Sequence, residues 1–281
     1  GPSHFALVPM QYSPKDYGLV LNVQVGNTNS LVVFDSGSAK LAVATTDCAE
    51  KELCSAQDAT YDPMSSPTAS PTMRAATLSF ATLTIDADII RERVFLPVMP
   101  SAATKSSSWI TPRVGQATAK CMIGDRFPVY AAVSMKGTSS NGFGFMPSDA
   151  DDSIFGALIH RLKCKRRWIL ACDTYGNAWL GIGEPPSGSF LHNYVRNCRY
   201  SPMVRSSIHD DAYVVAVDSF RGGKGKAKPT YMVIDTGTAD SYLLNMPDVG
   251  LPKSNQVVSS ADCRLLPNFR IALRGGPRMV I

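Results

Sequence analysis

The sequence lacks the features that mark membrane-spanning, metal-binding and nucleic-acid-binding proteins. None of its apolar runs is long enough to cross a bilayer, so we expect no transmembrane span. Its four histidines sit singly and its seven cysteines include no Cys-x-x-Cys pair, so we expect no zinc site and no cofactor. The net charge of +5 is small, and no aromatic residues interleave the basic run at residues 163–167. A nucleic-acid partner is therefore not expected.

The residues that are present are typical of a soluble, turn-rich β protein. Apolar residues make up 44% of the chain and charged residues 18%, with 21 glycines and 19 prolines scattered along it. Alternating patterns predict strands within residues 17–25, 77–90 and 168–180, with a turn at residues 26–29. The spacing of Ile154, Leu158 and Leu162 predicts a helix within residues 152–162. We therefore predict an all-β fold with a few short helices.

One supersecondary unit occurs twice, two hundred residues apart. The apolar run Leu31–Phe34 leads directly into Asp35-Ser36-Gly37-Ser38, and Tyr231–Ile234 leads into Asp235-Thr236-Gly237-Thr238. An apolar strand follows each turn. A single Asp-x-Gly turn is weak evidence because both residues are common in turns. Two copies with the same lead-in, hydroxyl residues and exit indicate a repeat at the scale of a whole lobe.

A pair of carboxylates in one solvent-poor site suits water-mediated hydrolysis. Two such groups cannot both ionise readily, so one keeps a proton while the other is charged. The charged group draws a proton from water, and the protonated group polarises a carbonyl. Aspartic proteases are the well-known example of two carboxyl groups that share one proton in this way. Neither a metal nor a covalent intermediate is needed.

These residues resemble the pepsin family of bilobal aspartic proteases. The resemblance implies that Asp35 and Asp235 are the catalytic pair. Gly37 and Gly237 would let the two turns approach each other. Ser36 and Thr236 would support the carboxylate pair through contacts between the turns. Ser38 and Thr238 would support it through contacts with the outer carboxylate oxygens. A boundary fits at the Gly183–Gly188 breaker cluster, which gives an N-terminal lobe at residues 5–184 and a C-terminal lobe at residues 185–281.

Other segments match the family in order along the chain. From spacing alone, Cys48 and Cys54 are compatible with a small disulfide loop or with buried free thiols; the resemblance implies the disulfide. Tyr61-Asp62-Pro63-x-x-Ser66 resembles the stretch after that loop, and residues 141–145 resemble the segment that closes the first active-site turn, with Gly142 in the substrate cleft. Residues 260–267, which include Cys263, resemble the start of a later strand in the family.

Three departures from the family concern activity and length. Family members close a hairpin, the flap, over the substrate with a tyrosine beside a glycine-rich tip. The equivalent residues here, 78–90, have no tyrosine or glycine; we expect a turn at residues 86–88 and place Phe80 in the cleft. Ala42 stands where a supporting tryptophan is usual. Because few residues follow Asp235, we expect an incomplete second lobe and a C-terminal fragment or second chain that completes it.

The sequence therefore predicts an aspartic endopeptidase that binds an extended peptide or protein substrate. The resemblance implies a secreted zymogen, or a protein of an oxidising or acidic compartment of the secretory pathway. The alternative is a catalytically impaired pepsin-like protein with a binding or inhibitory role, which the altered flap favours. A structural protein that uses the fold without a working cleft is the third class. Retention of both turns favours the enzyme.

Overall fold

The computed structural model is mostly β, as predicted. It describes residues 4–16, 18–54, 59–80, 83–137, 141–146, 148, 152–173, 175–196, 198, 203–204, 212–222, 228–237, 269–274 and 278–280. By contacts the chain divides into two compact units. The first comprises residues 1–197 and 235–239, and the second comprises residues 198–234 and 240–281. The predicted lobe boundary at residue 184 stays a prediction. Among the described residues, no helix is long and apolar enough to span a membrane.

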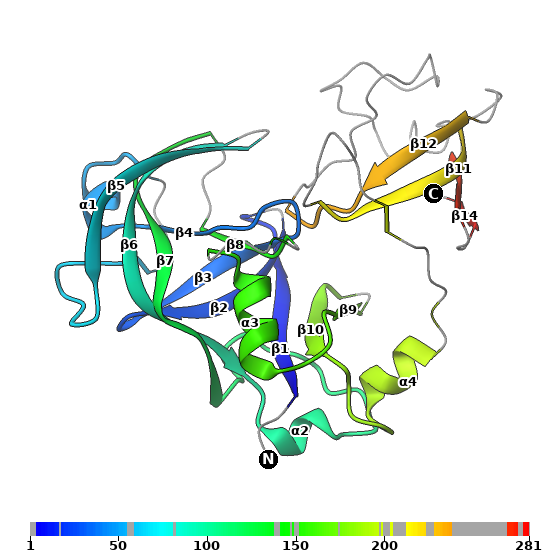
Figure 1. Cartoon of the computed structure of the whole chain (residues 1–281). Coiled ribbons are helices and arrows are strands. Elements are labelled where there is room, and N and C mark those ends of the chain that lie inside the picture. Colours follow the sequence, from blue (N-terminus) through cyan, green and yellow to red (C-terminus); the bar gives the residue numbers. More distant parts are fainter. Residues whose placement is uncertain are drawn as a thin grey trace. The chain divides into compact units, whose positions relative to one another are not determined.

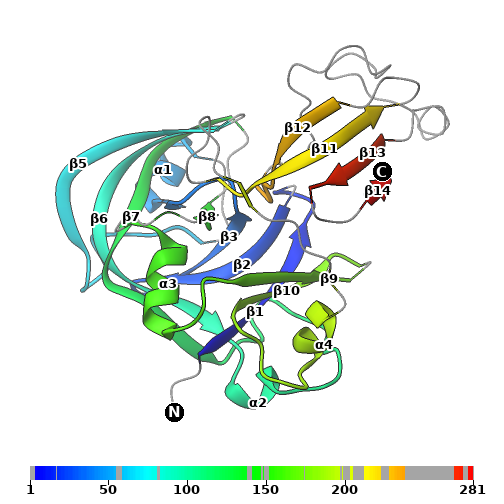
Figure 2. The ribbon, with the colours of Figure 1, turned by 45° about the vertical axis from the view of Figure 1, so that its right-hand side comes forward.

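The first unit is built on a ten-stranded sheet with the order β5-β6-β7-β4-β8-β3-β2-β1-β10-β9. Figure 1 shows β5, β6 and β7 curving side by side, and Figure 2 shows β1, β10 and β9 adjacent to one another. The strands are β1 Phe5–Ser13, β2 Gly18–Val25, β3 Thr28–Asp35, β4 Leu41–Ala44, β5 Ser70–Ser79, β6 Leu83–Val98, β7 Ala119–Gly137, β8 Gly142–Gly144, β9 Trp168–Cys172 and β10 Asn177–Gly183. The helices are α1 Thr46–Glu50, α2 Ser101–Thr104, α3 Ile154–Leu162 and α4 Phe190–Arg196.

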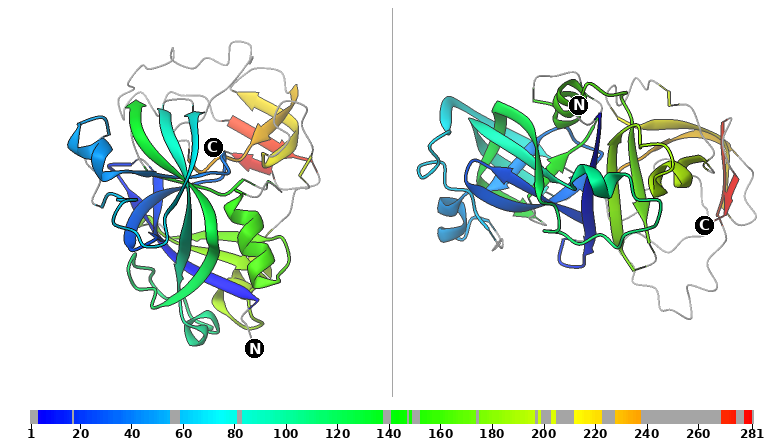
Figure 3. Two further views of the ribbon diagram at one scale, coloured as in Figure 1. Left: turned by 60° about the vertical axis from the view of Figure 1, so that its left-hand side comes forward. Right: turned by 90° about the horizontal axis from the view of Figure 1, so that it is seen from below.

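The second unit contains a four-stranded sheet with the order β12-β11-β13-β14. Its strands are β11 Val214–Gly222, β12 Lys228–Val233, β13 Phe269–Leu273 and β14 Arg278–Val280. Figure 3 shows these strands, coloured yellow to red, as one group. Val214 to Val217 are all buried in β11, which pairs with β12 on one side and β13 on the other. Residues 260–267, including Cys263, lie outside the described part of the chain.

The strand and helix predictions hold where the periodicity was clear. From Leu21 to Val25, β2 buries alternate residues, and Gly26, which has a φ of 57°, opens the turn into β3. The predicted helix is α3: the Ser153 hydroxyl accepts from the Gly156 amide at its N-terminus. The buried side chains Ile154, Leu158 and Leu162 face one core cluster. Cys48 and Cys54 form the predicted disulfide.

The predicted hairpin turn at residues 86–88 is wrong. Asp86, Ala87 and Asp88 lie inside β6, paired with β5 on one side and β7 on the other. The chain turns instead after Phe80, whose amide donates to the Leu83 carbonyl over 2.8 Å. The acidic pair suggested a turn, but acidic residues are also accommodated on the polar face of a strand. There the Asp86 carboxylate accepts hydrogen bonds from the hydroxyls of Thr77 and Ser134.

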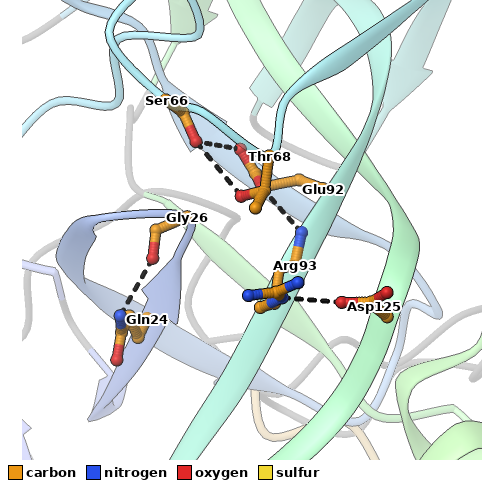
Figure 4. Close-up of polar contacts among 7 residues, drawn as sticks. All are labelled: Gln24, Gly26, Ser66, Thr68, Glu92, Arg93 and Asp125. Atoms are coloured by element: carbon orange, nitrogen blue, oxygen red, sulfur yellow. Dashed lines mark hydrogen bonds and ion pairs between the residues drawn. The ribbon is translucent and has the colours of Figure 1, made fainter.

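A buried carboxylate, Glu92 on β6, connects the loop after the disulfide to the sheet (Figure 4). Three hydroxyls donate to it, from Tyr61 over 2.7 Å, from Ser66 over 2.6 Å and from Thr68. The backbone amide of Arg93 also donates, over 2.7 Å. Burial raises the pKa of Glu92, but these donors outweigh burial and leave the pKa below its usual value. The sheet therefore encloses a charged group that is fully hydrogen-bonded.

We expect Glu92→Gln to destabilise the protein by about 2–3 kcal/mol at about pH 7, because an amide nitrogen would then face donors. A lowered pKa gives stability that is present above the usual glutamate pKa and lost as the pH falls through the folded-state value. The difference from wild type should therefore shrink in acid. Urea unfolding at several pH values measures it. Asp125→Asn, which breaks the exposed ion pair with Arg93, is the matched control and should cost less than about 1 kcal/mol. Equal losses in both variants would contradict the account.

Candidate active site

The first Asp-Ser-Gly-Ser turn lies where β3 ends against β8. β3 pairs in parallel with β8, so that Phe34 is opposite Phe143 and Asp35 is opposite Gly144. Phe34 and Phe143 are fully buried, which anchors the strand ends in the core. Backbone hydrogen bonds then fix the turn at three points: the amides of Gly144, Phe145 and Met146 donate to the carbonyls of Lys40, Asp35 and Ser38 over 2.8, 2.6 and 2.6 Å.

The second turn, Asp235 to Gly237, follows β12 and belongs by its contacts to the first unit. It has the same local geometry as the first turn. The Gly37 amide donates to Asp35 Oδ1 over 2.8 Å, and the Gly237 amide donates to Asp235 Oδ1 over 2.9 Å. In each turn the backbone therefore orients its own carboxylate through an Asp-x-Gly hydrogen bond. The repeat seen in the sequence is also a repeat in structure.

The hydroxyl residues of the two turns exchange hydrogen bonds. The Ser36 amide donates to Thr236 Oγ1 over 3.0 Å, and the Thr236 amide donates to Ser36 Oγ over 2.9 Å. The Thr236 hydroxyl also donates to the Phe34 carbonyl over 2.9 Å. Ser36 is fully buried, so these bonds are made away from bulk water. The predicted contact between Ser36 and Thr236 is therefore present, and it holds the two turns face to face.

The glycines bring each turn against the carboxylate of the other. A Cβ placed on Gly37 would lie 2.5 Å from Asp235 Cγ, and one on Gly237 would lie 2.5 Å from Asp35 Oδ1. Both positions are closer than real Cβ contacts allow, so no larger residue fits without displacing a carboxylate. The absence of these side chains is what permits Asp35 and Asp235 to share one site.

The electrostatics of this site favour the protonated form of Asp35. Burial raises the pKa of Asp35 to about 6, and the neighbouring Asp235 adds to the rise. Hydrogen bonds from the Ser38 side chain and the Gly37 amide act in the opposite direction but do not cancel it. Asp35 therefore keeps a proton in mildly acidic solution.

Of the remaining predicted site residues, the structure describes Ser38, Phe80 and Gly142 but not Thr238. Ser38 contacts the Asp35 carboxylate, whereas Thr238 lies outside the described residues. Phe80 is at the tip of the β5–β6 hairpin and packs against the apolar cluster beneath it. Gly142 is in β8, and a Cβ placed on it would have no atom within 4 Å. The assignment of Phe80 and Gly142 to a substrate cleft stays a prediction.

Asn141 is a positioning residue that sequence reasoning did not single out. It is buried, and its side chain accepts from the Ala44 amide over 2.7 Å and donates to the Leu31 carbonyl over 3.3 Å. Its own carbonyl accepts from the Val33 amide over 2.8 Å. Asn141 thereby joins β3 to β4 on either side of the first turn. The available signal was a polar residue directly before Gly142 in an otherwise apolar segment.

Comparisons with known proteins identify the fold. The family model for eukaryotic aspartyl proteases matches residues 18–100, a segment that contains the first turn but not the second. The crystal structure of aspartic proteinase from Irpex lacteus superimposes with a TM-score of 0.68 at 15% identity, over 98% of this chain and 78% of that one. The fold is that of the pepsin-like aspartic proteases. The resemblance read from the sequence is thereby confirmed, and it supports a protease function in general terms. A comparison with curated protein sequences finds no significant match.

The contact between Gly37 and Asp235 can be tested through stability in this pepsin-like fold. We expect Gly37→Ala to lower the free energy of unfolding by about 1–3 kcal/mol, because the new methyl group must displace a held carboxylate. Gly142→Ala is the matched control and should change it by less than about 1 kcal/mol, since that Cβ meets nothing. Urea unfolding of both variants measures the difference. Similar values for the two would show that the turns are not in close contact.

The raised pKa of Asp35 also predicts a stability difference that depends on pH. A group whose folded-state pKa is raised contributes stability below its unfolded pKa, and that stability is lost as the pH rises through the folded value. Asp35→Asn keeps the neutral shape and cannot ionise. We therefore expect this variant to gain about 1–3 kcal/mol over wild type between about pH 4 and pH 7. Unfolding curves across that range measure the gain, and a constant difference would contradict it.

Proposed function

We propose that this protein is an aspartic endopeptidase, in which Asp35 and Asp235 activate a water molecule for attack on a peptide bond. The observation that carries the proposal is the reciprocal packing of the two turns, in which each glycine rests against the other turn's carboxylate. A site built in this way offers two carboxyl groups to one small molecule. The family model and the fold support the general class of protease.

The residues of the site suggest how the reaction would run. One carboxylate accepts a proton from water, and the oxygen attacks the carbonyl carbon of the peptide bond. The protonated carboxyl of the pair donates a hydrogen bond to the carbonyl oxygen as negative charge develops there. Proton transfer to the nitrogen then releases an amine and a carboxylic acid. Ser36, Thr236 and the two glycines hold the carboxyl groups in place throughout.

The substrate class follows from the same reasoning. A peptide must be extended for its carbonyl to reach a recessed carboxylate pair, so we propose a peptide or protein substrate. The Cys48–Cys54 disulfide supports an oxidising compartment such as the secretory pathway. A C-terminal fragment or second chain as a further partner stays part of the proposal.

A second candidate, a binding or inhibitory protein with impaired catalysis, is favoured by one observation. The described residues of the β5–β6 hairpin contain no tyrosine, and Phe80 at its tip packs against the apolar cluster beneath the hairpin. A phenyl ring offers no hydroxyl for a substrate or a bound water. In this reading the two turns would still bind a peptide without hydrolysing it efficiently.

The pH dependence of peptide hydrolysis separates the two candidates. We expect the wild type to cleave an unfolded protein substrate in acid and to lose kcat/KM as the pH rises through about 6, where Asp35 gives up its proton. Asp35→Asn and Asp235→Asn should each reduce cleavage by at least about a thousandfold, because neither variant has the pair. Mass spectrometry of the products measures cleavage.

Two controls make this assay decisive. Reaction in ¹⁸O-labelled water should place one labelled oxygen in each new carboxyl group, as direct attack by water requires. Binding of a peptide with a hydroxyl-bearing tetrahedral centre should weaken in both aspartate variants. The enzyme proposal would be overturned, and the binding protein favoured, if wild type cleaves at no pH and both aspartate variants bind this peptide as tightly as wild type does.

A further inference from the structure

Lys40, Asp152 and Tyr130 form a polar cluster next to the first turn and outside the carboxylate pair. The Lys40 ammonium forms an ion pair with Asp152 Oδ2, and the Tyr130 hydroxyl donates to the same oxygen over 2.8 Å. The Lys40 ammonium also lies 5.8 Å from the centre of the Tyr130 ring. The three side chains therefore contact one another in all three pairs.

The cluster is too well enclosed to be an ordinary surface ion pair. The side chains of Lys40 and Asp152 are 29% and 19% exposed, and Tyr130 is buried. By contrast, Lys165 and Glu184 form an ion pair in which both side chains are at least half exposed. Partial burial strengthens the attraction between charges and makes the loss of one partner costly for the other.

Each member of the cluster belongs to a different part of the first unit. Lys40 lies between the first turn and β4, and its carbonyl accepts from the Gly144 amide. Asp152 lies just before Ser153, which caps helix α3. Tyr130 is on β7. The cluster therefore connects the first turn, the start of a helix and a strand of the large sheet.

Tyr130 also contacts the β5–β6 hairpin, because it pairs with Ile89 of β6. It pairs with Ala42 across β4 and β7, and its ring belongs to the apolar cluster that contains Ile85 and Ala87 of the hairpin. Phe80 packs against that cluster from the hairpin tip. Ala42 and Tyr130 therefore lie side by side on neighbouring strands and belong to the same apolar cluster as the hairpin residues. A displacement of Tyr130 would therefore change its contacts with the hairpin and, through Asp152, the position of Lys40.

We propose that Lys40, Asp152 and Tyr130 are positioning residues that couple the turn carrying Asp35 to the β5–β6 hairpin. The inference rests on the proposed function, since the turn and the hairpin are where a bound peptide would be held. Reaction at a carboxylate pair is sensitive to small displacements, so a loosened turn slows the chemical step more than it weakens substrate binding. None of the three residues contacts the reacting atoms in this account.

The kinetic test compares Lys40→Met and Asp152→Asn with Lys40→Arg, which keeps the charge, and with Lys165→Met as the matched control. We expect kcat to fall about tenfold or more in the first two variants, with KM within about twofold of wild type. Lys40→Arg should recover most of kcat, and Lys165→Met should match wild type. The concentration of folded active sites is measured by titration with the tight-binding peptide analogue, and each rate is divided by it. A partly unfolded variant is then not mistaken for one with a slower chemical step. Unchanged kcat in Lys40→Met, or no rescue by arginine, would overturn the proposal.

Two measurements test the coupling without any activity. Burial, followed by the hydrogen bond and charge of Asp152, raises the pKa of the Tyr130 phenol to about 12. Ultraviolet titration, with Tyr130→Phe as the blank, should find this pKa lowered in Asp152→Asn. Amide hydrogen exchange in residues 85–89 should quicken in Lys40→Met and Asp152→Asn but not in Lys165→Met. If wild type cleaves nothing, the proposed function fails. Unchanged exchange and an unmoved phenol pKa would instead show that the coupling is absent.

Discussion

The reciprocal hydrogen bonds between Ser36 and Thr236 are the interaction on which the candidate site depends. Each residue gives its amide to the hydroxyl oxygen of the other, so two turns distant in sequence form one rigid element. The glycine contacts follow from that approach, because each glycine needs the carboxylate of the other turn close beside it. A hydroxyl group on both residues is required, since an aliphatic side chain would leave a buried amide without an acceptor.

The two turns could be read from the sequence because each is encoded locally and the unit occurs twice. A strand, an acidic turn and an exit strand can each be read from neighbouring residues, and their repetition indicated a common role. The contact between Ser36 and Thr236 could be expected only through resemblance to a family. The hydrogen-bond partners of Asn141 could not be read from the sequence. Its partners, in β3 and β4, are about a hundred residues away, and nothing in the residue itself identifies them.

The hairpin shows where such reading fails. Residues 77–90 alternate continuously, so the pattern did not reveal that the chain reverses within them, and the acidic residues suggested a turn in the wrong place. β7 decides the outcome, because it pairs along β6 from Leu83 to Val98 and makes the hairpin part of a three-stranded layer. Met135 of β7 also donates its amide to the Leu53 carbonyl in the disulfide loop. These long-range pairings leave no periodic signal in the hairpin's own residues.

The mutual contact of the two glycines has a consequence for how such a protein changes over generations. A side chain at Gly37 would displace Asp235, and one at Gly237 would displace Asp35, so each half of the repeat constrains the other. Neither turn can drift alone without disturbing both carboxylates. A lineage can therefore alter residues outside the turns, such as Phe80 of the hairpin, before it can tolerate change in the turns themselves.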